Sequence, residues 1–524
     1  MNHTGLHIID YLIIITSLVI SIGVGFRFSK KQSNTSQYFS AGGSVPSWAI
    51  GFSIFATLIS SITFLAYPGE GYSSNWVRLV QGIMVPIVVI AMIGFIVPLY
   101  RNVIGLSAYE YFEKRFGYFA RLYSSLGFVL AHFSKMGSVF FLLSLAVASM
   151  TGVDTYVIII VLGIAVILLT LLGGMEAVIW LDVIQGFLLI LGGLVTLIII
   201  MTKVDGGLGT IIDVASADHK MSLGPFDWDF VNLTFWVMAI NGIFYAIQKY
   251  GTDQTIVQRY LAAKSDRDAE KASLIGVLMV VPIWTLFMFI GTALFVFYKS
   301  GVSQLPEGIR ADAVFPHFIL TEMPVGVVGL IISALLAAAI SSLDSDLNCL
   351  SAVGVDDYYK KLKPNATDQQ QLRMGKIIVV LSGIGAIIVA LIYTAAGNTG
   401  VLGVVFALYA IFSGGIVGIF LLGIFVPRAN KQGLYIGIVA CVLYTAYALL
   451  SSTPIGTGDD KRLLLDLGKL NYTQHKYMLG VYSHIVLFTV AWASSYLFPK
   501  AEVDKSLTYR GYLERKKRSK LSEK

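Results

Sequence analysis

Long apolar stretches recur along the whole chain and constrain its fold more than any other feature. A helix needs about 20 apolar residues to cross a bilayer. The sequence is 56% hydrophobic and 13% charged, whereas soluble proteins carry about 25% charged residues. We therefore predict an all-α membrane protein with 13 transmembrane helices. The candidate spans lie at roughly 8–27, 45–68, 76–100, 119–150, 154–173, 176–202, 230–250, 271–298, 314–350, 376–395, 400–425, 433–452 and 477–498.

The loops between these spans alternate in charge. Lysine and arginine, Arg259 and Lys264 among them, gather in every second loop and in the C-terminal tail, while the other loops are acidic. The positive-inside rule then places the N-terminus outside and the C-terminus in the cytoplasm. The net charge of +7 therefore reflects topology and contact with anionic membrane lipids, and no nucleic-acid partner is expected. We expect a monomeric, multi-pass protein of a bacterial inner (plasma) membrane.

An outward N-terminus and an odd number of spans predict one extra helix before a ten-helix core. Two groups of five helices in such a core have opposite orientations, as in the inverted repeats of many sodium-coupled transporters. We expect residues 1–44 to form the extra helix and a cytoplasmic loop, 45–425 the core, 426–498 two peripheral helices and 499–524 a basic cytoplasmic tail.

Oxygen-bearing side chains interrupt the apolar segment at 314–350. The run AAAISSLDSD at 337–346 holds two carboxylates and three hydroxyls. An acidic group within a membrane costs about 2.5–3.5 kcal/mol on insertion scales and usually marks an ion or substrate path. Oxygen ligands without histidine or cysteine suit a hard cation. The run therefore predicts a sodium site in a transporter.

The second span carries a different signal, a group of hydroxyls at mid-depth. Ser60 and Ser61 are adjacent and lie close to Thr57 and Thr63. Their hydroxyls can satisfy backbone groups freed by unwinding, which would expose carbonyls to a cation and a half-helix N-terminus to an anion. The alternative is an intact helix whose hydroxyls bond back to the preceding turn. Because the serine-rich run at 337–346 also predicts a cation site, the broken helix is the favoured interpretation.

Three polar segments on separate spans carry a family resemblance: GGMEAVIWLDVIQG at 173–186, GTDQTIVQRY at 251–260 and the serine-rich run. In this order they resemble the sodium/solute symporter family, which has the LeuT-type 5+5 inverted-repeat fold. Further segments, AGGSVPSW at 41–48, FATLISSITF at 55–64 and SAYEY at 107–111, are most similar to bacterial sodium-coupled sialic acid transporters. The resemblance covers nearly the whole chain.

The resemblance implies two adjacent Na+ sites, the first of which lies between the broken helix and the ninth span. Asp344 departs from the family, in which a serine is expected; its carboxylate could strengthen sodium binding or hold a proton. Asp346 points about 200° away from Asp344 around the helix and is expected to be structural or to face the cytoplasm. The first site would use carbonyls of Ala56, Ile59 and Ala338 with hydroxyls of Ser341 and Ser342, and the second would use Asp182, Ser341, Asp344 and Ser345.

The resemblance also implies a substrate pocket built from the broken helix and the fourth and seventh spans. Lys135 stands where an arginine of the sialic acid group pairs with the substrate carboxylate, although lysine lacks the bidentate fork. The alternative for Lys135 is pairing with a structural acid. One turn away, His132 is expected to be a packing residue, with a proton relay as the alternative. The candidate pocket residues are Ser60, Thr63, Gln81, Lys135, Asn241, Phe244, Tyr245 and Gln248.

These features predict a sodium-coupled symporter that imports an anionic sugar acid, most closely sialic acid (N-acetylneuraminate), by alternating access. The alternatives are a symporter of a neutral sugar, polyol or monocarboxylate, coupling to protons through Asp182 and Asp344, and a membrane sensor. The sensor is disfavoured because only about 26 residues follow the last span, far fewer than a domain needs. The sequence has no phosphate-binding loop, HExxH motif or nucleophile elbow, so we expect no enzyme.

Overall fold

The computed structural model describes residues 6–29, 32–59, 61–396, 414–454 and 462–522. In these ranges the secondary structure is helical, with one isolated bridge between Val45 and Ala263. The first helices are α1 (Ile8–Ser29), α2 (Thr35–Ser40), η1 (Ala41–Gly43), α3 (Ser47–Leu58), α4 (Ser61–Ser73), η2 (Trp76–Arg78), α5 (Leu79–Val103), α6 (Glu110–Phe116), α7 (Tyr118–Thr151), α8 (Thr155–Lys203), α9 (Gly207–Ala217) and α10 (Phe235–Gly251). The others are α11 (Gln254–Ala262), α12 (Asp266–Lys299), α13 (Ala311–Glu322), α14 (Val327–Val353), η3 (Gly354–Tyr359), α15 (Lys360–Leu362), α16 (Asp368–Ala396), α18 (Ile416–Phe425), α19 (Lys431–Leu450), η5 (Gly468–Leu470), α20 (Lys476–Ser494), η6 (Ser495–Leu497), η7 (Lys505–Leu507) and α21 (Tyr509–Ser522).

Nine helices in the described ranges are long and apolar enough to cross a membrane, and the bent pair α3 and α4 makes ten. The 49 residues of α8 would extend about 74 Å at 1.5 Å per residue, more than twice the hydrocarbon core of about 30 Å. Its backbone leaves helical geometry at Gly174, with φ 55° and ψ −164°, a conformation that glycine tolerates. The chain is thus an all-helical, multi-pass membrane protein. The predicted span at 400–425 lies partly outside the described residues.

The second span is broken, as the sequence predicts. Helix α3 ends at Leu58, and Ile59 is extended with φ −102° and ψ 107°. The helix axes on the two sides of the break differ by 57°. Thr57 still donates its hydroxyl to the Ser53 carbonyl at 2.8 Å, so back-bonding of hydroxyls and a broken helix occur together. Ser60 lies outside the described residues.

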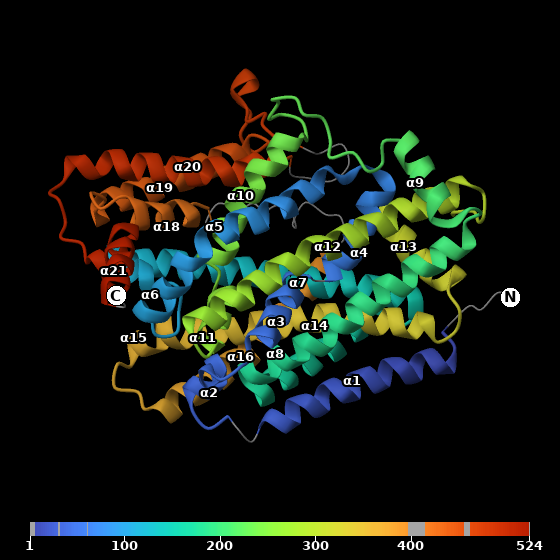
Figure 1. The fold of residues 1–524 in the computed structure, drawn as a ribbon, viewed down its shortest axis with the longest axis horizontal. Helices are drawn as coiled ribbons and strands as arrows, with labels where there is room; N and C mark the ends of the chain where they lie inside the picture. The colour runs from blue at the N-terminus through green and yellow to red at the C-terminus, as the bar shows by residue number, and fades with distance from the viewer. Residues whose placement is uncertain (1–5, 30–31, 60, 397–413, 455–461, 523–524) are drawn as a thin grey trace.

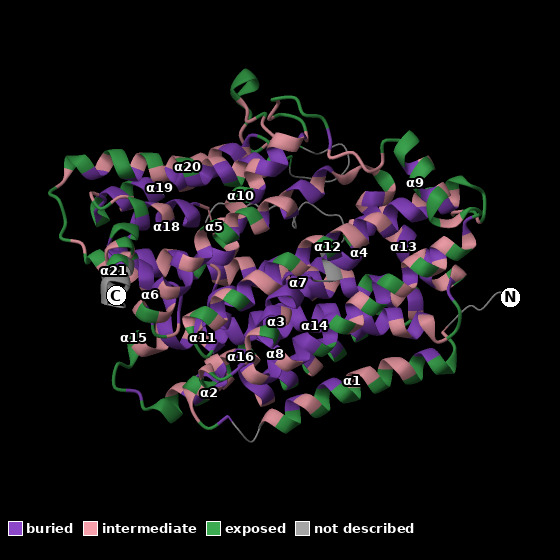
Figure 2. Cartoon of the chain, viewed as in Figure 1, coloured by how far each residue is buried: buried purple, intermediate pink, exposed green. Residues whose placement is uncertain are grey.

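Helix α14 is the most enclosed element of the bundle. Every residue from 331 to 353 is buried, and α14 packs against α1, α3, α4, α7, α8 and α16. Figure 2 shows α14 within the buried interior, whereas α1 carries exposed residues along the edge of the molecule. Asp10 of α1 accepts the N–H groups of Gly326 and Gly329, each at 2.8 Å. The extra N-terminal helix thus caps the helix that carries the serine-rich run. Helices α19 and α20 pack together on the opposite edge of the bundle (Figure 1).

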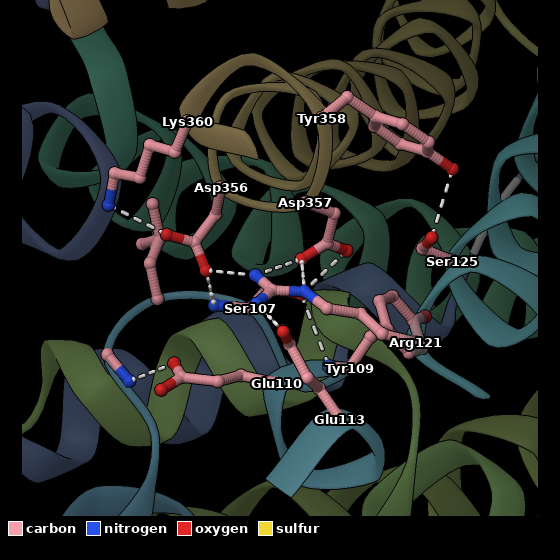
Figure 3. A network of polar contacts seen from close by, with 12 residues as sticks. Ser107, Tyr109, Glu110, Glu113, Arg121, Ser125, Asp356, Asp357, Tyr358 and Lys360 are labelled. Atoms are coloured by element: carbon pink, nitrogen blue, oxygen red, sulfur yellow. Dashed lines mark hydrogen bonds and ion pairs between the residues drawn. The ribbon is translucent and has the colours of Figure 1, made fainter. Parts of the chain in front are cut away.

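A charged network fixes the end of α14 to α6 and α7 (Figure 3). Arg121 of α7 contacts Glu113 at 2.6 Å, Asp356 at 2.7 Å and Asp357 at 2.5 Å. The two aspartates lie on η3, a π-helical turn, and such turns are rare and often occur at functional sites. Burial opposes ionisation of Glu113, but hydrogen bonds from Lys361 and Arg121 hold the pKa of its carboxyl below the usual value.

Helices α4 and α12 approach each other at two glycines, and we expect the contact to tolerate no side chain. A Cβ at Gly291 would overlap the Pro68 carbonyl, and one at Gly71 would overlap the Met288 carbonyl. Gly291→Ala should therefore force the helices apart and cost about 1–3 kcal/mol, seen as a lower melting midpoint of the detergent-solubilised protein. Gly480→Ala is the matched control, because nothing lies within 4 Å of its Cβ position. Equal midpoints for the two variants would contradict the close approach.

Candidate functional site

A fully buried arginine meets a fully buried aspartate where α8 and α11 approach each other. The side chains of Arg259 on α11 and Asp182 on α8 are both 0% exposed, and their Nη2 and Oδ2 atoms are 2.8 Å apart. Asp182 also accepts the hydroxyl of Ser53 at 2.5 Å and that of Ser341. Arg259 donates to Ser345 at 2.8 Å and to Ser53 at 2.7 Å. One ion pair therefore connects α3, α8, α11 and α14.

Sequence reasoning missed this role of Arg259. The sequence interpretation counted Arg259 among the cations of a loop and assigned it no buried partner. Arg259 lies on α11, a short helix whose residues from Gln254 to Tyr260 are all buried. Its motif, GTDQTIVQRY, begins with the residues that start α11: Asp253 accepts the N–H of Thr255 at 2.8 Å as a helix cap. A polar helix with a capping residue, directly after a span, was the sequence signal that could have indicated the buried position of Arg259.

Asp344 and Ser342 place unsatisfied oxygens beside this ion pair. Among the described residues, the Asp344 carboxylate oxygens and the Ser342 hydroxyl find no side-chain partner, and only the N–H of Ser345 lies near Asp344. Asp344 is 0% exposed and interacts electrostatically with Asp182 and Arg259. A buried carboxylate without a partner is strongly unfavourable. The site therefore needs a further cation or a proton.

The donor set of this cluster suits a monovalent cation. Asp182 and Asp344 supply two negative charges and Arg259 supplies one positive charge, so one positive charge is lacking. The available ligands are carboxylate and hydroxyl oxygens, which hard cations prefer. No group of three or more His, Cys, Asp or Glu residues suited to a metal ion occurs in the described ranges. This composition fits an ion such as Na+ better than a transition metal.

The residues of the first predicted sodium site lie on helices that touch. Ala338, Ser341 and Ser342 are buried on α14, which packs against both α3 and α4 beside the break. The Ala56 carbonyl accepts the N–H of Ile59 at 3.2 Å, and a carbonyl keeps a second lone pair for a cation. Of the second predicted set, Ser341 bonds directly to Asp182, and Ser345 is connected to it through Arg259. Both ligand sets stay predictions.

A cavity of about 310 Å³ lies between the break and two further helices. Its walls come from the end of α3, the middle of α7 and the end of α10. A smaller cavity of about 50 Å³ shares four of its lining residues and continues along α7. The larger cavity is lined by Thr57, Leu58, Ala131, His132, Lys135, Tyr245, Gln248, Lys249 and Asp253.

Charged side chains pair along the cavity wall. Lys135 contacts Asp346 on α14 at 3.0 Å, and Lys249 contacts Asp253 at 2.7 Å. His132 Nδ1 lies 2.9 Å from the same Asp346. The Lys135 side chain remains 29% exposed, whereas Asp346 is 1% exposed. Lys135 thus pairs with a structural acid, as the alternative prediction had it, and also lines the cavity. The sequence analysis did not identify Lys249 and Asp253 as residues of this cavity.

The other predicted pocket residues lie in different surroundings. Asn241 donates to the Tyr477 carbonyl at 3.1 Å, and Phe244 stacks on His484 with centroids 5.7 Å apart. Both therefore pack against α20 and do not line the 310 Å³ cavity, and neither does Gln81 of α5. Thr63 is buried on α4. Of the eight candidates, Lys135, Tyr245 and Gln248 meet at one cavity.

Comparisons with known proteins agree with this architecture. The profile of the Sodium:solute symporter family matches residues 38–440. The sodium/sialic acid symporter SiaT of Proteus mirabilis (strain HI4320) is 36% identical over 437 residues, covering 83% of this chain and 88% of SiaT. A solved substrate-bound outward-open state of a Na+-coupled sialic acid symporter is similar with a TM-score of 0.86 and 32% identity, over 95% of this chain and all of that one.

A more distant structure shows the fold alone. Mhp1, a nucleobase-cation-symport-1 family transporter, aligns with a TM-score of 0.58 at 15% identity, over 90% of this chain and 98% of Mhp1. Together these similarities confirm the predicted LeuT-like fold.

The buried ion pair leads to a stability prediction. Arg259→Gln should leave Asp182 charged and uncompensated, at a cost of about 3–5 kcal/mol, seen as a lower melting midpoint in detergent. Adding Asp182→Asn removes that charge, so the double variant should lose less than the sum of the two single variants. The control is Arg310→Gln, whose side chain is 71% exposed. Additive losses at 259 and 182 would contradict the pairing.

Proposed function

The chain belongs to the sodium:solute symporter family, and from this premise we propose that it imports an anionic sugar acid, N-acetylneuraminate, together with sodium ions by alternating access. The family makes the chain a sodium-coupled solute symporter and not an enzyme. The sugar acid is suggested by similarity to sodium/sialic acid symporters and by the chemistry of the cavity.

The observation that carries the proposal is the cavity beside the broken helix. An ammonium group, Lys135, stands there in reach of a ligand, with Tyr245 and Gln248 on the facing helix. A cation selects an anion in a low-dielectric site, and the phenol and amide suit the hydroxyl and amide groups of a sugar acid. Thr63 in the first turn of α4 would bind the same carboxylate near the positive helix end. The prediction gives the same role to Ser60, which lies outside the described residues.

The sodium ions would occupy two sites on one face of α14. Ala56, Ile59, Ala338, Ser341 and Ser342 would hold one ion and close the break between α3 and α4. The second ion would bind Asp344 with the hydroxyls beside the Arg259–Asp182 pair, because that cluster lacks one positive charge. Sodium and substrate would then stabilise the same state of the broken helix, and their coupling must be reciprocal.

Charge also sets the driving force. Two sodium ions with one monoanion carry one net positive charge inward, and each such charge gains about 2.3 kcal/mol per 100 mV. One sodium with a monoanion would be electrically neutral. Uptake by a two-sodium symporter should therefore respond to membrane potential.

The proposed topology has thirteen spans with the N-terminus outside and the C-terminus in the cytoplasm. Splitting α8 at Gly174 and adding α10 and the segment at 400–425 to the ten apolar spans gives this number. Residues 45–425 would form the inverted-repeat core, with the helix before it and the pair α19 and α20 at the periphery. A plasma membrane location and a monomeric state complete the proposal.

Uptake into proteoliposomes tests the substrate. Radiolabelled N-acetylneuraminate should accumulate only with an inward sodium gradient. Lys135→Ala should raise KM about 10- to 150-fold, because a hydrogen bond to a charged group contributes about 1.5–3 kcal/mol. Lys135→Arg should retain uptake, and the surface variant Lys299→Ala is the control, since its side chain is 49% exposed. Sodium-dependent uptake of a neutral sugar, with none of the sugar acid, would overturn the substrate assignment.

The role of Asp344 is tested by sodium titration. Asp344→Ser should raise the sodium concentration for half-maximal uptake about tenfold or more, because it removes a buried charged ligand. Asp213→Asn on the exposed surface of α9 is the control. If Asp344 instead holds a coupling proton, wild-type uptake should persist without sodium and collapse with a protonophore, which would contradict sodium binding there.

A further inference from the structure

The charged wall of the 310 Å³ cavity consists of Lys135, Lys249, Asp253 and His132, which line it, and of Asp346, which lies behind them in contact with Lys135 and His132. Lys249 and Asp253 lie 2.7 Å apart, and Asp253 also accepts the N–H and hydroxyl of Thr255. Lys249 and Thr255 therefore already compensate the Asp253 carboxylate. Asp346 makes close contacts with Lys135 at 3.0 Å and with His132 at 2.9 Å. The wall carries no net charge when the imidazole is neutral.

His132 lies between the two carboxylates. Its Nδ1 is in hydrogen-bond contact with Asp346, while its Nε2 faces Asp253 at 3.8 Å, beyond hydrogen-bond distance. In the neutral tautomer that donates from Nδ1 to Asp346, Nε2 has no proton to offer. A proton added at Nε2 gives an imidazolium that points one N–H at each acid. The site can thus accept a positive charge without moving a helix.

An anionic ligand would disturb this balance at Asp346. The Lys135 ammonium has three donors, and its one hydrogen bond to Asp346, at Oδ1, leaves donors for a ligand in the cavity. A substrate carboxylate would therefore share Lys135 with Asp346 and add one uncompensated negative charge. The proposed sodium ligand Asp344 points about 200° away from Asp346 on α14, so sodium there lies on the other face of the helix.

The remaining titratable groups around His132 do not suit this task. Tyrosine and cysteine can only gain negative charge, whereas imidazole gains positive charge between about pH 5 and 8. The groups that face the histidine and its two acids are Lys135 and Tyr123 on α7, Tyr245 and Lys249 on α10, Tyr109 before α6, Asp253 before α11, and Asp346 and Cys349 on α14.

We propose that binding of the anionic substrate is accompanied by uptake of one proton at His132. The resulting imidazolium compensates the negative charge of Asp346 when the substrate carboxylate contacts Lys135. The proton is taken up from the bulk solution and bonds to the Nε2 lone pair, while Nδ1–H continues to donate to Asp346. This inference rests on the proposed function and adds a proton to its binding step.

The test is a proton count at saturating sodium. N-acetylneuraminate is added to the purified full-length protein in weakly buffered detergent solution with a pH-sensitive dye, between pH 6 and 8.5. At the alkaline end we expect close to one proton taken up per molecule bound. By linkage, Kd should rise about tenfold per pH unit there. This wild-type measurement needs no variant.

The variant His132→Gln distinguishes the effect of proton uptake from the effect of the hydrogen bond to Asp346. Glutamine can still donate to Asp346 but takes up no proton, so binding should weaken, and both the proton uptake and the pH dependence of Kd should vanish. His317→Gln on α13, a residue that does not line the cavity, should leave both unchanged.

The outcomes distinguish the two proposals. Sodium-dependent binding of N-acetylneuraminate without proton uptake, and with a Kd independent of pH, would overturn the role of His132 and leave the proposed function intact. Proton uptake that persists in His132→Gln would also overturn it. Failure to bind N-acetylneuraminate at any pH with sodium present would instead count against the proposed function.

Discussion

The buried pair Arg259–Asp182 is the interaction on which the central architecture depends. Each charge would be costly alone in the bundle interior, so each must meet oriented partners. Asp182 accepts from Ser53 and Ser341, and Arg259 donates to the Thr255 carbonyl at 2.6 Å as well as to side chains. Satisfying two charges therefore requires four helices to hold a fixed arrangement. The break after α3 lies little more than one turn from Ser53, within this fixed region.

This pair also explains the ionic character of the site beside it. Arg259 compensates Asp182 and donates to the hydroxyl of Ser345, and in the part of the chain that the structure describes no side chain hydrogen-bonds to Asp344. The added carboxylate leaves one negative charge that the protein does not neutralise. On the other face of α14, Asp346 is neutralised by Lys135. One helix thus separates a cluster that lacks a cation from a cavity wall that is balanced, and movement of α14 would affect both.

Local sequence patterns predicted much of this. The adjacent serines at 60 and 61 indicated the break, and the helix does end at Leu58. The run at 337–346 indicated a buried polar face, and α14 is the most enclosed helix. The family and its fold followed from motifs that match along most of the chain. These signals are local because backbone breaks and buried polar faces are encoded within one or two helical turns.

Pairing between distant residues was not predictable in the same way. The sequence determined that the chain crosses a membrane many times, where one helix breaks, and which helix carries a buried run of oxygen-bearing side chains. Only the tertiary structure decided that Arg259 is buried against Asp182. It also decided that Asp346 pairs with Lys135 and His132. Likewise, only the fold brings the Asn241 amide to the Tyr477 carbonyl. The physical reason is that a buried charge must find its partner across helices more than seventy residues apart, and no local pattern records which partner packing brings within 3 Å.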